Sequence, residues 1–414
     1  MHTLSLTAGQ QTVAIRSNTP CVTDWAATYF GRYWNASPAQ DTTAGHGPVV
    51  TVIDGDHRAP AAMAHTHHAV FAREPIGYTR HLDNTVIAHT LTDPVIAFRY
   101  TPDAQHLQIS SRQPLQPTAR PGRPTRLATA TTRFAREMMR ARLIAAGWVL
   151  LHASAAVLPG GRTLLTLGDS GAGKTTTALT LASTGAELLA NDCCFARPNT
   201  SGSLDLLPWP AAAAVGLGLL HALLLTDSAR AHLKTGEPPH PTQDRRVTDA
   251  LTTGRTGTLT SASGRELKAH IWPEQLTRWF GLPLATTGIA AGVLLPRIVS
   301  STSAPTCVND DRSAEVTTSV FVTSDEERYP DFFGFTNGNN AGMPTARLEV
   351  LQRLNRLPRQ AVDLSHDQTA NTRLLTALTA SLQSGQHHHP PAIGTAASTF
   401  PWRSGPTAGC WCGP

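Results

Sequence analysis

Near its middle the chain reads Gly168-Asp169-Ser170-Gly171-Ala172-Gly173-Lys174-Thr175. This stretch matches the Walker A template G-x-x-x-x-G-K-[ST] at every fixed position. An apolar, β-favouring run at 162–167 precedes it, and 176–183 has the composition of a helix. A strand, a glycine-rich turn and a helix start therefore follow one another, which predicts a loop whose backbone N–H groups converge on phosphate oxygens.

The charge in this stretch favours a nucleoside phosphate as ligand. A helix N-terminus carries partial positive charge, Lys174 adds a full charge, and the Thr175 hydroxyl is a ligand type that suits Mg²⁺. No motif that reads a base is visible, so ATP is expected and GTP is the alternative. The residues expected to bind the nucleotide are Gly168, Asp169, Ser170, Gly171, Ala172, Gly173, Lys174, Thr175 and Thr176.

Two further positions bear on chemistry beside this loop. An apolar run at 186–190 ends in Asn191-Asp192, only one helix and one strand after the loop. Mg²⁺-binding carboxylates are presented in this way beside phosphate loops. Asn191 can bind a metal through its amide oxygen but cannot accept a proton at neutral pH. His152 ends another apolar run, one hairpin before the loop, and either a catalytic or a purely structural role fits that position.

Composition narrows the class of protein. The chain has 414 residues, of which 41% are hydrophobic and 15% charged, enough for one large core or two moderate ones. Its net charge of +5 comes almost wholly from arginine, since the only lysines are Lys174, Lys234 and Lys268. No basic cluster with interleaved aromatic residues occurs, so we do not expect a nucleic-acid partner.

The cysteine content and the N-terminus predict a soluble, cytoplasmic protein. Six cysteines in a chain of this length suit a reducing compartment, and Met1–Ala8 lacks the basic and apolar regions of a signal peptide. The longest apolar run, 211–225, is too short for a membrane span and predicts a buried helix. No membrane partner is therefore expected.

The order of segments predicts two folded parts. Short β-like runs at 49–53, 86–89, 95–100 and 107–110 predict an antiparallel, β-rich N-terminal lobe over 1–115. In this lobe, Asp54 and Asp56 read as turn formers, and His65, His67 and His68 as a polar edge rather than a metal site. The predicted divisions that follow are a Pro- and Arg-rich linker at 116–125, a second domain at 126–383 and a disordered tail at 384–414.

Several elements of the second domain are predicted from periodicity and stop signals. A helix is expected over 126–146, ended by Gly147, and core strands over 148–151 and 292–297. Polar composition predicts a mobile loop at 236–257 and a long polar insertion at about 300–345. Closing helices are expected at 348–357 and 371–382.

The segments His152-Ala-Ser, Gly168–Thr175 and Gly185–Asp192 together resemble the core of HPr kinase/phosphorylase and its HPr-kinase-like relatives. The resemblance covers about 148–195 and is nearest to divergent relatives found beside peptide natural-product genes. It implies an α/β fold with a P-loop core of the HPr kinase / phosphoenolpyruvate carboxykinase type and an N-terminal β-rich lobe. It also implies ATP- and Mg²⁺-dependent phosphoryl transfer to a hydroxyl, usually serine, of a peptide, protein or small molecule. The family often assembles, which leaves a homo-oligomer open.

The resemblance suggests roles for single residues. Lys174 would bind the β- and γ-phosphates, and Thr175, Asp192 and Asn191 would hold Mg²⁺. Asp192 would alternatively accept the proton of the attacking hydroxyl, and His152 is either the second candidate for this base or the group that orients Asp192. In a chain that uses arginine for nearly every cation, the surviving Lys268 and its neighbour Arg265 are candidates to neutralise the transferred phosphoryl group. A solvent-exposed pair is an equally good reading of these two residues.

One departure from the family leaves a second hypothesis open. The family carries two acids where this chain has Asn191-Asp192, and the later signature of the regulatory enzyme is not recognisable. These departures weaken the expectation that HPr is the acceptor, and they leave reverse phosphorylase activity open. The alternative is a nucleotide-gated binding or assembly protein with a weakened catalytic site. A transport ATPase subunit is disfavoured, because the acid follows the loop too closely.

Overall fold

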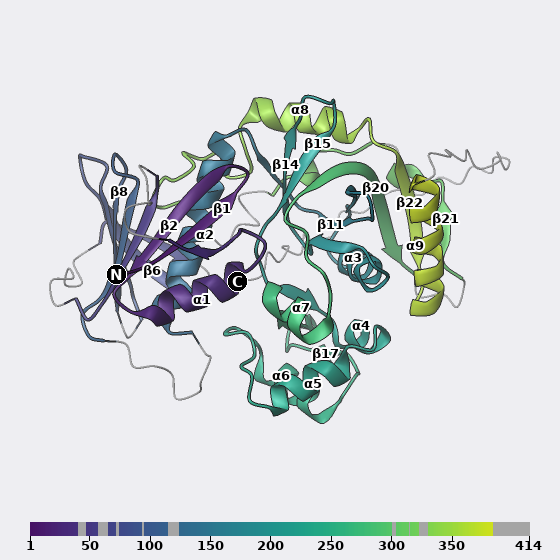
Figure 1. The fold of residues 1–414 in the computed structure, drawn as a ribbon, viewed down its shortest axis with the longest axis horizontal. Coiled ribbons are helices and arrows are strands. Elements are labelled where there is room, and N and C mark those ends of the chain that lie inside the picture. Colours follow the sequence, from purple (N-terminus) through teal and green to yellow (C-terminus); the bar gives the residue numbers. More distant parts are fainter. Residues whose placement is uncertain are drawn as a thin grey trace.

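The computed structural model shows a mixed α/β protein with two large sheets lying side by side (Figure 1). It describes residues 1–39, 47–56, 65–71, 74–92, 95–114, 124–299, 304–313, 315–322 and 330–383. The predicted tail at 384–414 and nearly all of the predicted linker lie outside this range. None of the described helices combines the length and apolar character needed to cross a bilayer.

The first sheet contains nine strands in the order β3-β1-β2-β4-β9-β8-β7-β6-β5. The antiparallel expectation is wrong at β4, which runs parallel to both β2 and β9. Two parallel strands need a long crossover connection between them, and the chain between β2 and β4 contains the helix α1 (Pro20–Phe30). This connection allows β4 to run parallel to β2. The strand bounds are β1 His2–Ala8, β2 Gln11–Ser17, β3 Ser37–Pro38, β4 Val49–Asp54, β5 His67–Phe71, β6 Glu74–Arg80, β7 Val86–Thr90, β8 Ile96–Thr101 and β9 His106–Ser111.

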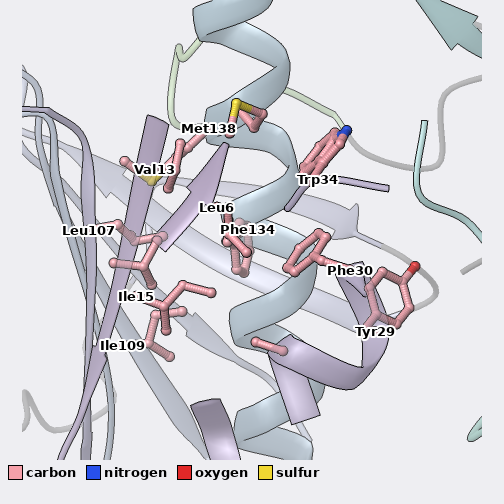
Figure 2. Close-up of a cluster of buried hydrophobic side chains, with 14 of the residues drawn as sticks. Leu6, Val13, Ile15, Tyr29, Phe30, Trp34, Leu107, Ile109, Phe134 and Met138 are labelled. Carbon is pink, nitrogen blue, oxygen red and sulfur yellow. The ribbon is translucent and has the colours of Figure 1, made fainter. Parts of the chain in front are cut away.

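Helices α1 and α2 (Arg126–Ala145) pack on the first sheet and enclose a core of apolar side chains (Figure 2). The structure confirms the predicted helix at 126–146. The Thr125 hydroxyl caps its start by accepting a hydrogen bond from Ala128 N at 3.1 Å, and Gly147 follows with φ +86°. Phe134 and Met138 lie on the buried stripe of α2, so the helix that follows the predicted linker belongs to the core of the first sheet.

The second sheet follows the order β10-β14-β15-β20-β12-β11-β13, and β20 also pairs with β22. Leu294 packs with Leu181 of α3 (Lys174–Ser183) and Leu375 of α9 (Gln368–Gln383), whereas Val293 packs with Val350 of α8 (Pro344–Leu354). Since neighbouring strand residues face opposite sides, helices cover both faces. The strands are β10 Val149–Leu151, β11 Ser154–Val157, β12 Arg162–Thr166, β13 Glu187–Ala190, β14 Cys194–Pro198, β15 Leu204–Pro208, β20 Gly288–Ile298, β21 Thr306–Val308 and β22 Arg359–Leu364.

A smaller helical part, labelled α4 to α7 in Figure 1, lies between β15 and β20 in sequence. The buried helix predicted at 211–225 is wrong in part, because the extended Gly216 divides it into a short strand and a short helix. The mobile loop predicted at 236–257 contains a helix, whose start is capped by the Asp244 carboxylate accepting from Arg246 N at 2.9 Å. The elements are β16 Ala213–Val215, α4 Leu217–Ala222, α5 Thr226–Lys234, α6 Arg245–Thr253, β17 Leu259–Thr260, β18 Glu266–Leu267, β19 Ala269–Ile271 and α7 Pro273–Phe280.

The predicted polar insertion contains a buried aromatic segment. Residues 330–335 return to the first sheet, where Phe332 O accepts a hydrogen bond from Arg80 Nη2 at 3.1 Å. Phe333 is 2% exposed and packs edge-on against Phe134 of α2, with ring centroids 5.3 Å apart. The polar insertion predicted at about 300–345 is therefore wrong at 332–333, where the side chains are buried in the core of the first sheet.

We expect Phe333→Ala to lower the free energy of unfolding by about 3–5 kcal/mol, because it leaves a cavity between α2 and the first sheet. Urea unfolding would measure the change. Leu348→Ala is a suitable control, since Leu348 is 59% exposed on α8 and should change stability by no more than about 0.5 kcal/mol. Equal effects of the two substitutions would contradict a packing role for the segment.

Candidate functional site

The ends of several strands meet at one edge of the second sheet. β12 runs parallel to β20, and β20 to β22, so their carboxyl ends lie together. β11 is antiparallel to both β12 and β13, which brings the end of β13 and the start of β11 to the same edge. The glycine-rich loop, Asn191-Asp192 and His152 are thereby placed at the edge where open α/β sheets bind ligands.

The loop after β12 adopts a conformation that requires its glycines. Gly168, Gly171 and Gly173 have φ of +142°, +87° and +112°, values that side chains with a Cβ rarely adopt. A Cβ on Gly173 would also lie 3.2 Å from Ile298 Cγ1. Residues 168–171 are exposed, and Ala172 N donates to Asp169 O at 3.1 Å within the turn. The loop therefore offers its backbone to solvent at the start of α3.

Lys174 is the first residue of α3 and is 7% exposed. Its ammonium turns back into the loop and donates to Gly168 O at 2.6 Å and Asp169 O at 3.2 Å. Gly173 precedes it as an N-cap without a side chain, so no side chain occupies the first N–H groups of the helix. A fixed positive charge and a helix N-terminus thus coincide, an arrangement that attracts anions.

Thr175 and Thr176 follow on the first turn of α3 and are half-buried. Across the described residues, the Thr175 hydroxyl makes no hydrogen bond, so it is available to a ligand at the loop. Thr176 O accepts from the Thr180 hydroxyl at 2.6 Å, a contact internal to the helix.

His152 and Asp192 form a pair at the same edge. His152 Nε2 lies 3.1 Å from Asp192 Oδ1, and His152 N donates to Val320 O at 2.7 Å. The Ser154 hydroxyl donates to Asn191 O, which ties the start of β11 to the end of β13. The structure thus brings together two residues that lie 40 positions apart in the sequence.

Two buried oxygens at this pair lack hydrogen-bond partners among the described residues. They are Asn191 Oδ1 and Asp192 Oδ2. Buried polar atoms are nearly always satisfied, so an unsatisfied pair of hard oxygens suits a cation as partner. The residues described contain no cluster of three or more His, Cys, Asp or Glu that could hold a metal by itself. One carboxylate, one amide oxygen and the Thr175 hydroxyl suit Mg²⁺, which commonly uses one or two carboxylates together with phosphates and water.

Arg265 and Lys268 lie in the smaller helical part, next to β18 and β19. Within the described residues, the Lys268 ammonium pairs with Glu266 at 3.8 Å, and Lys268 O accepts from Gln243 Nε2 at 3.0 Å. Arg265 N donates to the Ser261 hydroxyl at 3.1 Å. The role of these two residues at the loop stays a prediction.

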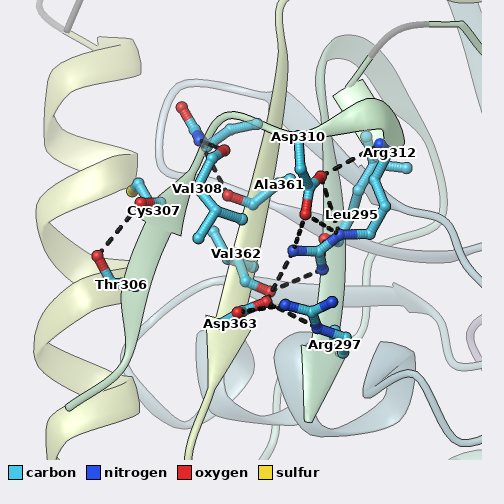
Figure 3. A network of polar contacts seen from close by, with 11 residues as sticks. Leu295, Arg297, Thr306, Cys307, Val308, Asp310, Arg312, Ala361, Val362 and Asp363 are labelled. Atoms are coloured by element: carbon cyan, nitrogen blue, oxygen red, sulfur yellow. Dashed lines mark hydrogen bonds and ion pairs between the residues drawn. The ribbon is translucent and has the colours of Figure 1, made fainter. Parts of the chain in front are cut away.

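An ion-pair cluster that the sequence analysis did not predict lies on the other side of the loop, and Figure 3 shows the cluster. Arg297 at the end of β20 and Asp363 at the end of β22 are in register and share two hydrogen bonds, of 3.2 and 2.6 Å. Arg312 Nη2 donates to Asp363 Oδ1 at 2.7 Å and also binds Asp310. Partial burial acts to raise the pKa of Asp363, but hydrogen bonds from Arg297 and Arg312 outweigh it, so this pKa lies below its usual value.

This cluster fixes the strand ends that support the loop. Ile298 and Leu364, the next residues on the two strands, face the opposite side, where a Cβ on Gly173 would meet them at 3.2 and 3.5 Å. Arg297 and Asp363 therefore hold β20 and β22 together directly behind the residue that precedes Lys174. No sequence signal marks the pair, because 66 positions separate its members.

Comparisons with the models of known protein families and with curated protein sequences found no match. The likeness to HPr-kinase-like proteins therefore remains a prediction from the quoted residues.

The lowered pKa of Asp363 predicts a specific acid sensitivity. A carboxyl group whose pKa is lower in the folded state contributes stability above its unfolded value of 3.8, and loses it as the pH falls through the folded value. From about pH 5 to about pH 3, wild type should lose more free energy of unfolding than Asp363→Asn, as measured by urea unfolding at each pH. Glu349→Gln, which removes an exposed ion pair on α8, should follow the wild-type slope. Equal slopes for wild type and Asp363→Asn would contradict the ion-pair role.

Proposed function

We propose that this protein is an ATP- and Mg²⁺-dependent kinase of the HPr-kinase-like type, which transfers a phosphoryl group to a hydroxyl. One observation carries the proposal. The Lys174 ammonium is folded into a glycine-rich loop at a helix N-terminus, and that loop shares a sheet edge with the His152–Asp192 pair. Phosphoryl transfer needs positioning and charge neutralisation more than covalent chemistry from the protein, and this edge offers both.

The loop and the start of α3 would bind the nucleotide. The first turn of α3 and the loop N–H groups other than that of Ala172 would face the phosphates, and Lys174 would exchange its two carbonyl partners for phosphate oxygens. ATP is the expected nucleotide, and GTP meets the same loop chemistry. When bound, the nucleotide supplies the phosphoryl group and Mg²⁺ neutralises its charge.

Thr175, Asp192 and Asn191 would hold the metal ion. The unsatisfied Asp192 Oδ2 and Asn191 Oδ1 support this assignment, since both are hard oxygen donors. Asn191 contributes an oxygen without a negative charge, so the site would bind Mg²⁺ through a single carboxylate and depend more on the phosphates of the nucleotide.

His152 and Asp192 would manage the proton of the acceptor hydroxyl. In the first arrangement, His152 Nε2–H donates to Asp192 Oδ1 and orients the carboxylate, whose Oδ2 would accept the hydroxyl proton instead of holding the metal ion. In the second, the carboxylate orients the imidazole and His152 accepts the proton. The acceptor would be a serine or another hydroxyl of a peptide, a protein or a small molecule. Arg265 and Lys268 are the candidates to neutralise the charge of the phosphoryl group during its transfer.

The direct test incubates purified protein with Mg²⁺, γ-labelled ATP and candidate peptides encoded by neighbouring genes. Label should appear on a peptide hydroxyl, and Lys174→Ala should abolish it by removing the charge that the phosphates need. Asp192→Asn should lower kcat by about 10²-fold or more, because it removes both a metal ligand and a proton acceptor. Nucleotide binding without transfer or hydrolysis would overturn the kinase proposal.

Asn191 favours a second candidate function, a nucleotide-gated binding or assembly protein. An amide stands where the related kinases carry an acid, which weakens metal binding and removes a proton acceptor. Asn191→Asp decides between the two functions, because the added carboxylate restores what a decayed site lacks. The measurement is labelled phosphate transfer by wild type and Asn191→Asp at equal nucleotide saturation.

If the site has decayed, Asn191→Asp should raise transfer from the background by tenfold or more. In a functional kinase that uses one carboxylate, wild type should already transfer phosphate and Asn191→Asp should change the rate by less than about threefold. Lys174→Ala combined with Asn191→Asp serves as the control and should be inactive in either case.

A further inference from the structure

A separate cavity lies away from the glycine-rich loop, between the first sheet, α2 and residues 241–242. Its volume is about 310 Å³, which is within the range of small-molecule sites. This is room for on the order of ten water molecules, more than packing defects of a normal core leave. The cavity is lined by Phe71, Glu74, Ile76, Thr90, Ile96, Phe98, Pro124, Arg126, Thr129, Ala130, Arg133, Phe134, Pro241 and Thr242.

Most of the wall is apolar and rigid. Phe71 and Phe134 stack with ring centroids 4.4 Å apart and an interplanar angle of 11°, and Phe98 meets Phe134 edge-on at 4.9 Å. Ile76 and Ile96 are each 1% exposed and complete this surface. The apolar wall favours an apolar ligand body.

Three charged side chains line the cavity, namely Glu74, Arg126 and Arg133, and their charges sum to one net positive charge. Arg126 Nη2 pairs with Glu74 Oε1 at 2.5 Å, and the same arginine donates to the Thr92 hydroxyl at 2.7 Å. Arg133, two helical turns further along α2, is half-buried and has no ion pair or hydrogen bond within the described residues. One positive charge is therefore left over beside an apolar wall, where charge is costly without a partner.

We propose that this cavity binds a small amphipathic anion, with an apolar body against the phenylalanines and a carboxylate, or a group of like charge, paired to Arg133. The guanidinium fork matches a carboxylate through two parallel hydrogen bonds. Arg126 is the less suitable partner because Glu74 already neutralises it. The proposal stands independently of the kinase activity.

The ligand would also touch the smaller helical part of the protein. Pro241 and Thr242 form one side of the cavity, and the Thr242 hydroxyl lies 3.3 Å from His270 Nδ1 on β19. The adjacent Gln243 accepts from His270 N at 2.6 Å and donates to Lys268 O. An occupant would thus join the first sheet and α2 to the segment that carries Lys268, and should raise the melting temperature of the whole chain.

Calorimetric titration of the full chain with octanoate, octanol and octylammonium tests the proposal, because these probes share a tail and differ in charge. Octanoate should bind at least tenfold more tightly than the other two and raise Tm. Arg133→Gln should weaken octanoate binding by about tenfold, the expected effect of losing a hydrogen bond to a charged group, and leave octanol unchanged.

Two further variants test the proposal even if Arg133→Gln does not fold. Ala130→Leu fills the cavity without changing charge and should abolish binding of all three probes. Arg112→Gln removes the same charge from an exposed position outside the cavity and should bind octanoate as wild type does. The proposal is wrong if octanoate binds no better than octylammonium, or if Arg133→Gln and Ala130→Leu both bind octanoate as wild type does.

Discussion

The parallel pairing of β12 with β20 is the constraint from which the site follows. The two strands pair from Arg162 and Ile289 to Thr166 and Leu294, with one register shift between Thr163 and Leu164, and Leu167 N still donates to Leu294 O at 2.9 Å. β20 then continues beyond the last residue of β12. The chain after β12 must therefore turn away over residues that β20 supplies, and only glycine accommodates the required backbone angles and the approach of Ile298.

The same strand pairing places the charged side chains of Lys174, Asp192 and Asp363 at one edge of the sheet. Lys174 is nearly buried, and its ammonium is satisfied by two loop carbonyls rather than by a carboxylate. An acid paired to it would neutralise the charge that attracts an anion. The acids lie instead on either side of the loop: Asp192 with His152, and Asp363 with Arg297 and Arg312. Among the described residues, Asp192 Oδ2 has no hydrogen-bond partner, whereas both carboxylate oxygens of Asp363 accept from arginines and hold the strands in place.

The first sheet packs directly against the second sheet, which carries the glycine-rich loop. Trp34 is fully buried, stacks on Phe30 at 5.2 Å and donates from its indole N–H to Pro208 O at the end of β15. Phe333 follows, in the chain, the segment that bridges to Leu151 of β10, and it packs against Phe134 of α2. Because these aromatic contacts are buried, the cavity beside α2 and the loop at β12 belong to one packed body.

Neighbouring residues encode the glycine-rich loop, the helix α2 that ends before Gly147, and the strand that ends at Asn191-Asp192, and the sequence was enough to predict these features. These depend on local backbone preferences and on helical or strand periodicity. Only the tertiary contacts determine the parallel course of β4, the Arg297–Asp363 pair and the position of Arg133, which has no partner among the described residues, at an apolar cavity. Their partners are far apart in the chain, and only the folded topology brings them together or leaves one of them without a partner.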